Sequence, residues 1–207
     1  CRKDDGLGRN VRQLFLHEGS AAMMEQVTHS RLFYFSLITL AILPDEGRET
    51  LLALCAATRA KGSRIAFDGN YRPRLWSDAA TACHWRDRAI ALCDIGLPTL
   101  ADEVEMGAAD DAADAAARWG AGDGRDIVVK LGAAGCLVDG VLVAPPRTVD
   151  VVDSSTAADA FNGGYIHARL AGATPRDAAL AGHRLAGWNI THRGAIPARD
   201  ADAPYGS

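Results

Sequence analysis

The sequence predicts an α/β protein of three layers, in which helices cover both faces of a mostly parallel central sheet. Short runs rich in β-branched and aromatic residues alternate with longer segments whose apolar residues recur at helical spacing. The 207 residues are 48% hydrophobic and 23% charged, which is enough apolar material for one substantial core. We therefore expect a single domain over residues 1–207.

The predicted strands are short and apolar. Leu32 to Ile38 is mostly aromatic and aliphatic, as a buried strand is, and the stretch from Val149 to Val152 has three β-branched residues, Val149, Val151 and Val152. Gly132 to Gly135 has the composition of a turn. In chain order, the other predicted strands are Arg64 to Tyr71, Asp94 to Leu97, Ile127 to Leu131 and a hairpin pair within Cys136 to Val143.

The predicted helices carry apolar residues three and four positions apart. Glu46 to Lys61 places Leu51, Leu54 and Cys55 on one face, and Gly62 ends it. The other predicted helices are Ala79 to Leu92, one or two alanine-rich helices within Asp102 to Trp119 broken near Gly107, Ala157 to Ala171, and Pro175 to His192.

Composition and charge exclude several classes of protein. There are 26 acidic and 22 basic side chains, a net charge of -4, and no basic run that would follow a nucleic-acid backbone. The apolar stretch Leu32 to Leu43 is interrupted by Ser36 and Thr39, so we expect no membrane span. The start at Cys1 leads into no apolar segment, which argues against a signal peptide, and it indicates that the recorded chain begins inside a longer one.

The cysteines and histidines indicate no disulfide framework and no zinc site. The five cysteines are an odd number at wide spacing without a Cys-x-x-Cys pair, and no His-x-x-x-His pair occurs. We expect reduced thiols, mostly in the core of a cytoplasmic protein.

The most informative stretch runs from Val149 to Tyr165. A block of small residues precedes a helical pattern that carries Asp159 in its first turn. A helix start offers backbone N–H groups and a positive dipole end to a phosphate, and an aspartate there can take the proton from an attacking hydroxyl. Aspartate also favours helix starts for capping alone, so the spacing by itself leaves both interpretations open.

A second group of polar residues ends the predicted strand Arg64 to Tyr71. Side chains in a strand alternate between faces, so Asp68, Asn70 and Arg72 would project together near its carboxyl edge. Ligands of open α/β sheets collect at such edges, and an arginine can grip a carboxylate or a phosphate. The alternative is a polar strand end that leads into a turn at Pro73.

These motifs resemble those of a known family. Asp153 to Tyr165 is similar to the C-terminal signature of the ribokinase-like (PfkB) sugar kinases. The resemblance implies a ribokinase-like fold, ATP as phosphoryl donor, Asp159 as catalytic base, and an anion hole formed by Thr156, Ala157 and Ala158.

The segment Asp68 to Trp76, Asp-Gly-Asn-Tyr-Arg-Pro-Arg-Leu-Trp, is similar to the version found in 2-keto-3-deoxygluconate kinases. In that group, the arginine that matches Arg72 contacts the carboxylate of the sugar acid, and the stretch that matches Asn70, Tyr71 and Arg72 lies near the nucleotide. Three further segments resemble the same group: Tyr34 to Leu40, Leu97 to Glu103, and Ala181 to Gly187 followed by His192 to Pro197.

Two weaker motifs gain meaning from the resemblance. Thr99 to Asp102 stands where the family carries Asn-x-x-Glu, which implies that Asp102 contacts Mg²⁺ through water, although Thr-x-x-Asp is equally a helix-capping pattern. The family's strand-to-turn segment along the nucleotide is matched by Lys130, Leu131, Gly132, Ala133, Ala134 and Gly135.

The chain also departs from the family. The family's usual glycine before the base is Ala158 here, and Thr156 replaces a glycine or alanine. His17 stands where the 2-keto-3-deoxygluconate kinases have a substrate-binding arginine, and the lid and first strands of the family fold are missing. If the loop needs a positive φ at Ala158, the anion hole is distorted, whereas a helical Ala158 changes little.

We therefore expect ATP-dependent phosphorylation of a terminal hydroxyl of a sugar acid, 2-keto-3-deoxygluconate first. The alternatives are another PfkB-type sugar kinase, a non-catalytic nucleotide-binding remnant and a structural partner subunit. We expect a small sugar acid and ATP as partners, with no nucleic acid and no membrane, and a homo-oligomer is compatible with the sequence.

Overall fold

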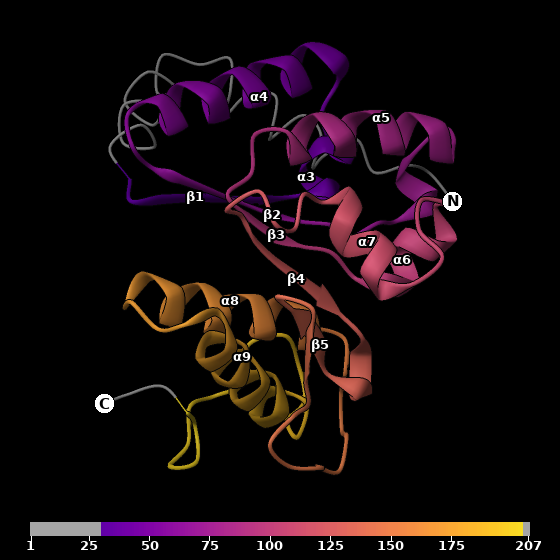
Figure 1. The fold of residues 1–207 in the computed structure, drawn as a ribbon. Coiled ribbons are helices and arrows are strands. Elements are labelled where there is room, and N and C mark those ends of the chain that lie inside the picture. Colours follow the sequence, from indigo (N-terminus) through magenta and orange to yellow (C-terminus); the bar gives the residue numbers. More distant parts are fainter. Residues whose placement is uncertain (1–29, 205–207) are drawn as a thin grey trace. The chain divides into compact units, whose positions relative to one another are not determined.

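The computed structural model describes residues 30–204. They fall into two compact units, the first ending at Asp110 and the second beginning at Asp111 (Figure 1). No helix among residues 30–204 combines the length and apolar character needed to cross a membrane.

The first unit contains a parallel sheet. Strand β1 (Leu32–Ser36) pairs with β2 (Arg64–Asp68), and β2 pairs with β3 (Ile95–Leu97). Asp68 lies opposite Ser36 on one side and Leu97 on the other, so all three strands end at one carboxyl edge. The predicted strands are confirmed here, but β1 and β2 end earlier than the sequence indicated.

The strand predicted over Leu32 to Ile38 is wrong at its end. The chain turns at Ser36 into helix α3 (Leu37–Ile42), and the Ser36 N–H donates to Thr39 Oγ1 at 3.3 Å. A serine followed three residues later by a side chain that accepts from its backbone is typical of a helix start. The apolar run that follows suits a buried helix and a buried strand equally, so it did not reveal where the strand ends.

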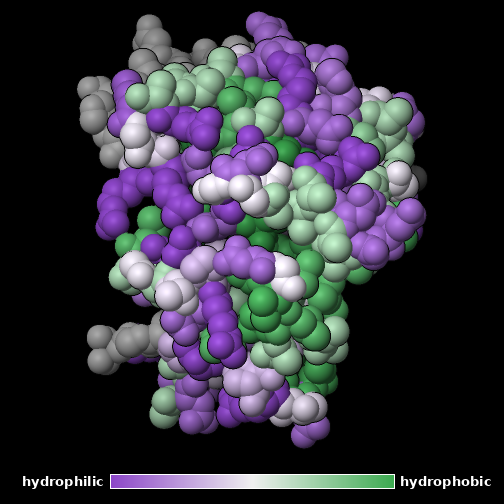
Figure 2. Space-filling model, in the orientation of Figure 1, coloured by the Kyte–Doolittle hydropathy of each residue, from purple (hydrophilic) through white to green (hydrophobic). Residues whose placement is uncertain are grey.

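Helices pack on this sheet as the apolar spacing predicts. Helix α4 (Asp45–Ala60) packs against β2; Leu51 and Cys55 of the helix are buried, and Ile65 and Phe67 of the strand are fully buried. The other helices of this unit are α5 (Ala79–Ile90) and α6 (Leu100–Glu105), with a short 3₁₀ turn over Pro73–Leu75. Figure 2 shows hydrophilic and hydrophobic residues side by side on the visible face, while the fully buried side chains of the first unit, such as Leu37 and Phe67, are mostly apolar.

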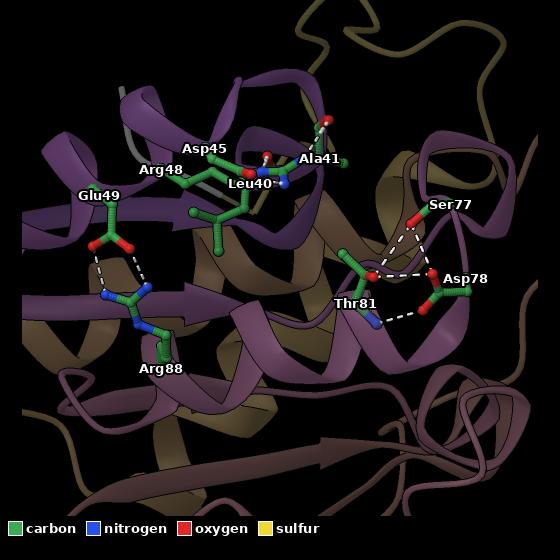
Figure 3. Close-up of polar contacts among 9 residues, drawn as sticks. All are labelled: Leu40, Ala41, Asp45, Arg48, Glu49, Ser77, Asp78, Thr81 and Arg88. Atoms are coloured by element: carbon green, nitrogen blue, oxygen red, sulfur yellow. Dashed lines mark hydrogen bonds and ion pairs between the residues drawn. The ribbon is translucent and has the colours of Figure 1, made fainter.

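Polar side chains fix the ends of these helices (Figure 3). Arg48 of α4 reaches back to the end of α3, where its Nε donates to the Leu40 carbonyl at 2.7 Å. Asp78 caps α5 by accepting the Thr81 N–H at 2.7 Å, and Arg88 of α5 pairs with Glu49 of α4. The contacts of Arg48 and Asp78 satisfy backbone groups that helix ends leave without partners, whereas the Arg88–Glu49 pair joins side chains of two helices.

The second unit contains an antiparallel sheet. Strand β4 (Asp126–Lys130) pairs with β5 (Cys136–Val138), and β5 pairs with β6 (Val141–Val143). Asp139 and Gly140 both have positive φ, 50° and 73°, as a two-residue hairpin turn of this hand requires. The predicted hairpin is confirmed.

Helices α7 (Ala112–Arg118), α8 (Ala157–Leu170) and α9 (Pro175–Asn189) complete this unit; α7 lies within its predicted range, and α8 and α9 begin where predicted. The break expected near Gly107 is also present, with a φ of 66° at that glycine. The strand predicted over Val149 to Val152 is wrong, because Val151 and Val152 are 61% and 53% exposed and lie in an irregular segment. A β-branched run has no sheet partner here, so its propensity does not decide its conformation.

Candidate functional site

The first predicted group of site residues begins at the carboxyl edge of the parallel sheet. Asp68, the last residue of β2, is fully buried, and its Oδ2 accepts a 3.4 Å hydrogen bond from the Tyr34 hydroxyl of β1. The strand ends there, so the alternation that was expected to align Asp68 with Asn70 and Arg72 does not extend to them. Asn70 is half-buried and Arg72 is exposed in the loop that follows.

Asp102 is brought against this same loop. It lies in the first turn of α6, and its Oδ2 accepts the Tyr71 backbone N–H at 3.1 Å. Thr99, the residue before the helix, makes no side-chain cap hydrogen bond. This argues against the alternative that Thr99 to Asp102 is only a helix-capping pattern. Burial raises the pKa of the Tyr71 phenol, and the Glu105 carboxylate adds to the effect. The structure thus joins two separately predicted motifs of the first unit.

The second group lies at the start of α8. Thr156 is the residue before the helix, Ala157 and Ala158 are its first two residues, and Asp159 is the third and is exposed. The first N–H groups of a helix have no intrahelical acceptor, and the helix dipole favours negative charge at this end. The arrangement can therefore present backbone donors to an anion with a carboxylate beside them.

Ala158 has a helical conformation, which answers the question raised by the sequence. Ala158 is the second residue of α8, and its φ is not positive. Asp139 is the one non-glycine residue with a positive φ in residues 30–204. Alanine is favoured in a helix, so alanine in place of glycine should alter the backbone at this position little.

The segment before α8 is held by the end of α9 and the residues after it. The N–H groups of Val152 and Asp153 both donate to the Ile190 carbonyl, at 2.8 and 3.1 Å. Asp153 Oδ2 accepts the Gly194 N–H at 3.1 Å, and hydrogen bonds from Ser155 and Gly194 keep the pKa of Asp153 below its ordinary value. The approach to Asp159 is therefore built from two segments far apart in the sequence.

The Thr156 side chain takes part in the same attachment. Its hydroxyl makes no cap hydrogen bond to α8 and instead donates to Asn189 Oδ1, the last residue of α9, at 3.0 Å. The Ala195 carbonyl is a second, longer acceptor at 3.4 Å. Sequence reasoning missed Asn189, since an asparagine that ends a helix is commonplace.

Lys130 ends β4 and points into the interior. It is 6% exposed, and its Nζ donates to Asn162 Oδ1 at 3.3 Å. Asn162 follows Asp159 by three residues and so lies on the same face of α8. Asn162 was also missed, because a polar residue inside a helical pattern gives no signal of the strand that it faces.

The glycine-rich turn after Lys130 has a structural reason of its own. Gly132 and Gly135 have φ values of 63° and 109°. A Cβ on Gly135 would lie 2.2 Å from the Val143 carbonyl oxygen, a distance that no side chain tolerates. Ala133 and Ala134 are exposed between them, which leaves the turn accessible.

Two expectations concern residues or groups beyond these. His17 lies outside the described residues. Within the part of the chain that the structure describes, no three His, Cys, Asp or Glu side chains gather where they could hold a metal ion. A cation at Asp102 would therefore need water and ligand oxygens besides the protein.

Relatives of known function match most of the chain. The 2-dehydro-3-deoxygluconokinase of Escherichia coli (strain K12) is 37% identical over 191 residues, which are 89% of this chain and 62% of that protein. The enzyme of the same name from Haemophilus influenzae is 30% identical over 192 residues, 90% of this chain and 61% of that protein. The chain thus spans about three fifths of the length of these relatives.

Solved structures share the fold. The 2-dehydro-3-deoxygluconokinase from Thermotoga maritima matches with a TM-score of 0.72 at 20% identity, covering 84% of this chain and 58% of that one. The aminoimidazole riboside kinase from Salmonella enterica, complexed with aminoimidazole riboside and an ATP analog, matches with a TM-score of 0.69 at 27% identity. That match covers 79% of this chain and 57% of the other.

The predicted fold class, a mostly parallel sheet flanked by helices of the ribokinase-like kind, is confirmed by these matches. The profile of the pfkB family carbohydrate kinases matches residues 8–202, nearly the whole chain. The matched range contains both motif segments, Asp68 to Trp76 and Asp153 to Tyr165. This chain belongs to the pfkB family of carbohydrate kinases.

Proposed function

We propose that this protein transfers the γ-phosphoryl group of ATP to a terminal hydroxyl of a sugar acid. The acceptor that its relatives favour is 2-keto-3-deoxygluconate, also called 2-dehydro-3-deoxygluconate, and the product is the 6-phosphate. The observation that carries the proposal is Asp159, an exposed carboxylate in the first turn of α8, next to backbone donors in a pfkB family chain.

Asp159 acts as the general base. Its carboxylate takes the proton from the terminal hydroxyl, and the oxygen of that hydroxyl bonds to the γ-phosphorus. The bond from that phosphorus to the bridging oxygen breaks, and ADP leaves with the electron pair. Thr156, Ala157 and Ala158 form the anion hole, where backbone N–H groups stabilise the charge on the transferred group.

The remaining site residues bind and orient the reactants. Arg72 orients the carboxylate of the acceptor, for which its exposed guanidinium is suited, and His17 and Asn70 contribute to acceptor binding. The nucleotide contacts are Asn70, Tyr71, Arg72, Lys130, Gly132, Ala133, Ala134 and Gly135. Both compact units serve one kinase domain in this proposal.

Mg²⁺ would neutralise charge on the phosphates when it is bound. The Asp102 carboxylate fits this ion, since Mg²⁺ prefers hard oxygen ligands and the Tyr71 N–H holds this carboxylate in place. Because no three potential ligand side chains gather around a cation site in residues 30–204, Asp102 would act through water.

Another sugar acceptor is the second candidate. Proteins named aminoimidazole riboside kinase, from Salmonella typhimurium, and fructokinase, from Klebsiella pneumoniae, match the chain at 32% and 29% identity. Turnover of fructose or aminoimidazole riboside above that of 2-keto-3-deoxygluconate would select this candidate.

The test is ATP-dependent phosphorylation of 2-keto-3-deoxygluconate by this chain and by a version extended at its N-terminus. We expect turnover in the extended version, abolished by Asp159→Asn, with ATP binding retained in calorimetry. Arg72→Ala should raise the KM for the acid while sparing sugars that lack a carboxylate. Unchanged turnover in Asp159→Asn would sink the assignment, and ATP binding without turnover in both versions would identify a non-catalytic remnant.

A further inference from the structure

Thr156 and Thr99 differ from the other threonine and aspartate residues that precede helices in residues 30–204, because neither caps its helix with its side chain. Thr174 accepts the Asp177 N–H at 3.1 Å at the start of α9, and Asp111 accepts two N–H groups at the start of α7. Thr156 stands in the same position for α8 and caps nothing, because its hydroxyl donates to Asn189. Its backbone, at φ -125° and ψ 18°, also lies outside the extended region that Thr174 occupies.

The bond to Asn189 has a consequence for anion binding. A threonine that caps a helix accepts the N–H of the second or third helical residue, and in α8 these are Ala158 and Asp159. The Ala158 N–H belongs to the proposed anion hole, and the Asp159 N–H is the next donor of the same helical turn. A hydroxyl that capped them would compete with phosphate, and the buried Asn189, 5% exposed, holds the hydroxyl at 3.0 Å instead.

We infer that Asn189 is a positioning residue for phosphoryl transfer, which acts by keeping the Thr156 hydroxyl away from the first-turn N–H groups of α8. The inference rests on the proposed function and adds to it a residue that contacts neither reactant. It also explains how this chain accommodates threonine where the family has glycine or alanine: the hydroxyl that alanine lacks is given a partner elsewhere.

The effect of Asn189→Ala on nucleotide binding should depend on the presence of the Thr156 hydroxyl, and this dependence separates a positioning role from a merely structural one. Asn189→Ala releases the hydroxyl, and we expect it to weaken binding of Mg²⁺ and the non-hydrolysable ATP analogue AMP-PNP about fivefold and to lower kcat/KM for ATP similarly, as one capping hydrogen bond would. Thr156→Ala keeps the backbone N–H groups of the anion hole and removes the competing hydroxyl. Made in this background, Asn189→Ala should no longer weaken AMP-PNP binding, so the double variant Thr156→Ala/Asn189→Ala should bind the analogue as tightly as Thr156→Ala does. A loss of about fivefold on adding Asn189→Ala in both backgrounds would overturn the inference.

A readout without nucleotide keeps the inference testable if the protein proves inactive. Amide hydrogen exchange at Ala158 and Asp159 should slow in Asn189→Ala and should not slow in the double variant, because only the first has a hydroxyl free to cap. Thr191→Val is the matched control, since the Thr191 hydroxyl donates to the Trp188 carbonyl at 2.7 Å and lies next to His192 Nδ1, whereas the Thr156 hydroxyl donates to Asn189. Unchanged exchange in Asn189→Ala would refute the inference, whereas absent turnover with slowed exchange would refute only the proposed function.

Discussion

Gly164 of α8 faces Gly182 of α9 so closely that a Cβ built on Gly164 would lie 2.9 Å from the Gly182 Cα. The two backbones therefore touch where the helices cross. Because α8 carries Asp159 and α9 ends at Asn189, this contact fixes the two helices that position the proposed anion hole.

The glycine contact predicts a contrast between two neighbouring substitutions. Gly164→Ala should lower the free energy of unfolding by about 1–3 kcal/mol, because the methyl group overpacks the helix crossing. Gly163→Ala is the control: nothing lies within 4 Å of a Cβ there, so the alanine should raise stability by up to about 1 kcal/mol through helix propensity. Denaturant unfolding of the two variants measures both, and equal effects would show that the helices do not touch at Gly164.

A buried ion pair supports the helix that carries Asp102. Arg86 of α5 and Glu103 of α6 are both 0% exposed, with 2.9 Å between Nη1 and Oε2. Arg86→Met leaves a buried carboxylate without its cation, and we expect a loss of about 3–5 kcal/mol in the free energy of unfolding. The double variant Arg86→Met/Glu103→Leu should lose less of the free energy of unfolding than Arg86→Met, since it leaves neither charge of the pair buried.

The control for this prediction is Arg88→Met, two residues further along the same helix. Arg88 pairs with Glu49 at the surface, where solvent screens the charges, so its removal should cost far less than that of Arg86. Chemical unfolding of the three variants measures their free energies of unfolding. An Arg86→Met protein as stable as the Arg88→Met protein would contradict the prediction.

The helical conformation of Ala158 predicts that restoring the family's residue gains little. Ala158→Gly should leave kcat within about twofold, because an alanine in the first turn of a helix needs no relief of strain. It should also lower stability slightly, by up to about 1 kcal/mol. Steady-state kinetics on the extended protein measure the first effect, and a tenfold gain in kcat would mean that the loop requires a backbone conformation that alanine resists.

Much of this architecture is predictable because the signals are local. The apolar spacing of α4, the Asp-Gly turn at Asp139 and the proline that begins α9 each act within a few residues. The end of β1 was misjudged because Leu37–Ile42 is apolar except for Thr39, and a short apolar run suits a buried strand and a buried helix equally.

Contacts across long stretches of sequence were not predictable from local patterns. Thr156 and Asn189 are 33 residues apart, and Tyr71 and Asp102 are 31 apart. Each residue by itself is ordinary, and only the packing of its helix or loop decides which partner it meets. The motifs therefore indicated where the site lies, while the residues that hold it in place required the structure.

The residues after α9 form a cluster that should respond to pH. His192 Nδ1 donates to the Trp188 carbonyl at 2.8 Å and Nε2 donates to Asp200 Oδ2 at 2.9 Å, while Asp200 Oδ1 accepts the Trp188 indole N–H at 2.8 Å. Both ring nitrogens face acceptors, so the contacts are complete only when the ring carries both protons. The Trp188 carbonyl first, and then Asp200, raise the pKa of His192 above its ordinary 6.5, and the Trp188 indole and His192 lower that of Asp200 below 3.8.

The sign of the pH effect follows from these directions. The stabilisation from His192 is fully present below pH 6.5 and is lost as the pH rises through the raised folded-state pKa, whereas that from Asp200 is present above pH 3.8 and is lost on acidification through its lowered pKa. The chemical shift of the Trp188 indole N–H should therefore titrate above pH 6.5, and His192→Gln should abolish that titration. Asp200→Asn should move the midpoint downward, because the imidazolium loses its carboxylate. A midpoint below 6.5 in the unaltered protein would mean that burial, rather than these partners, governs His192.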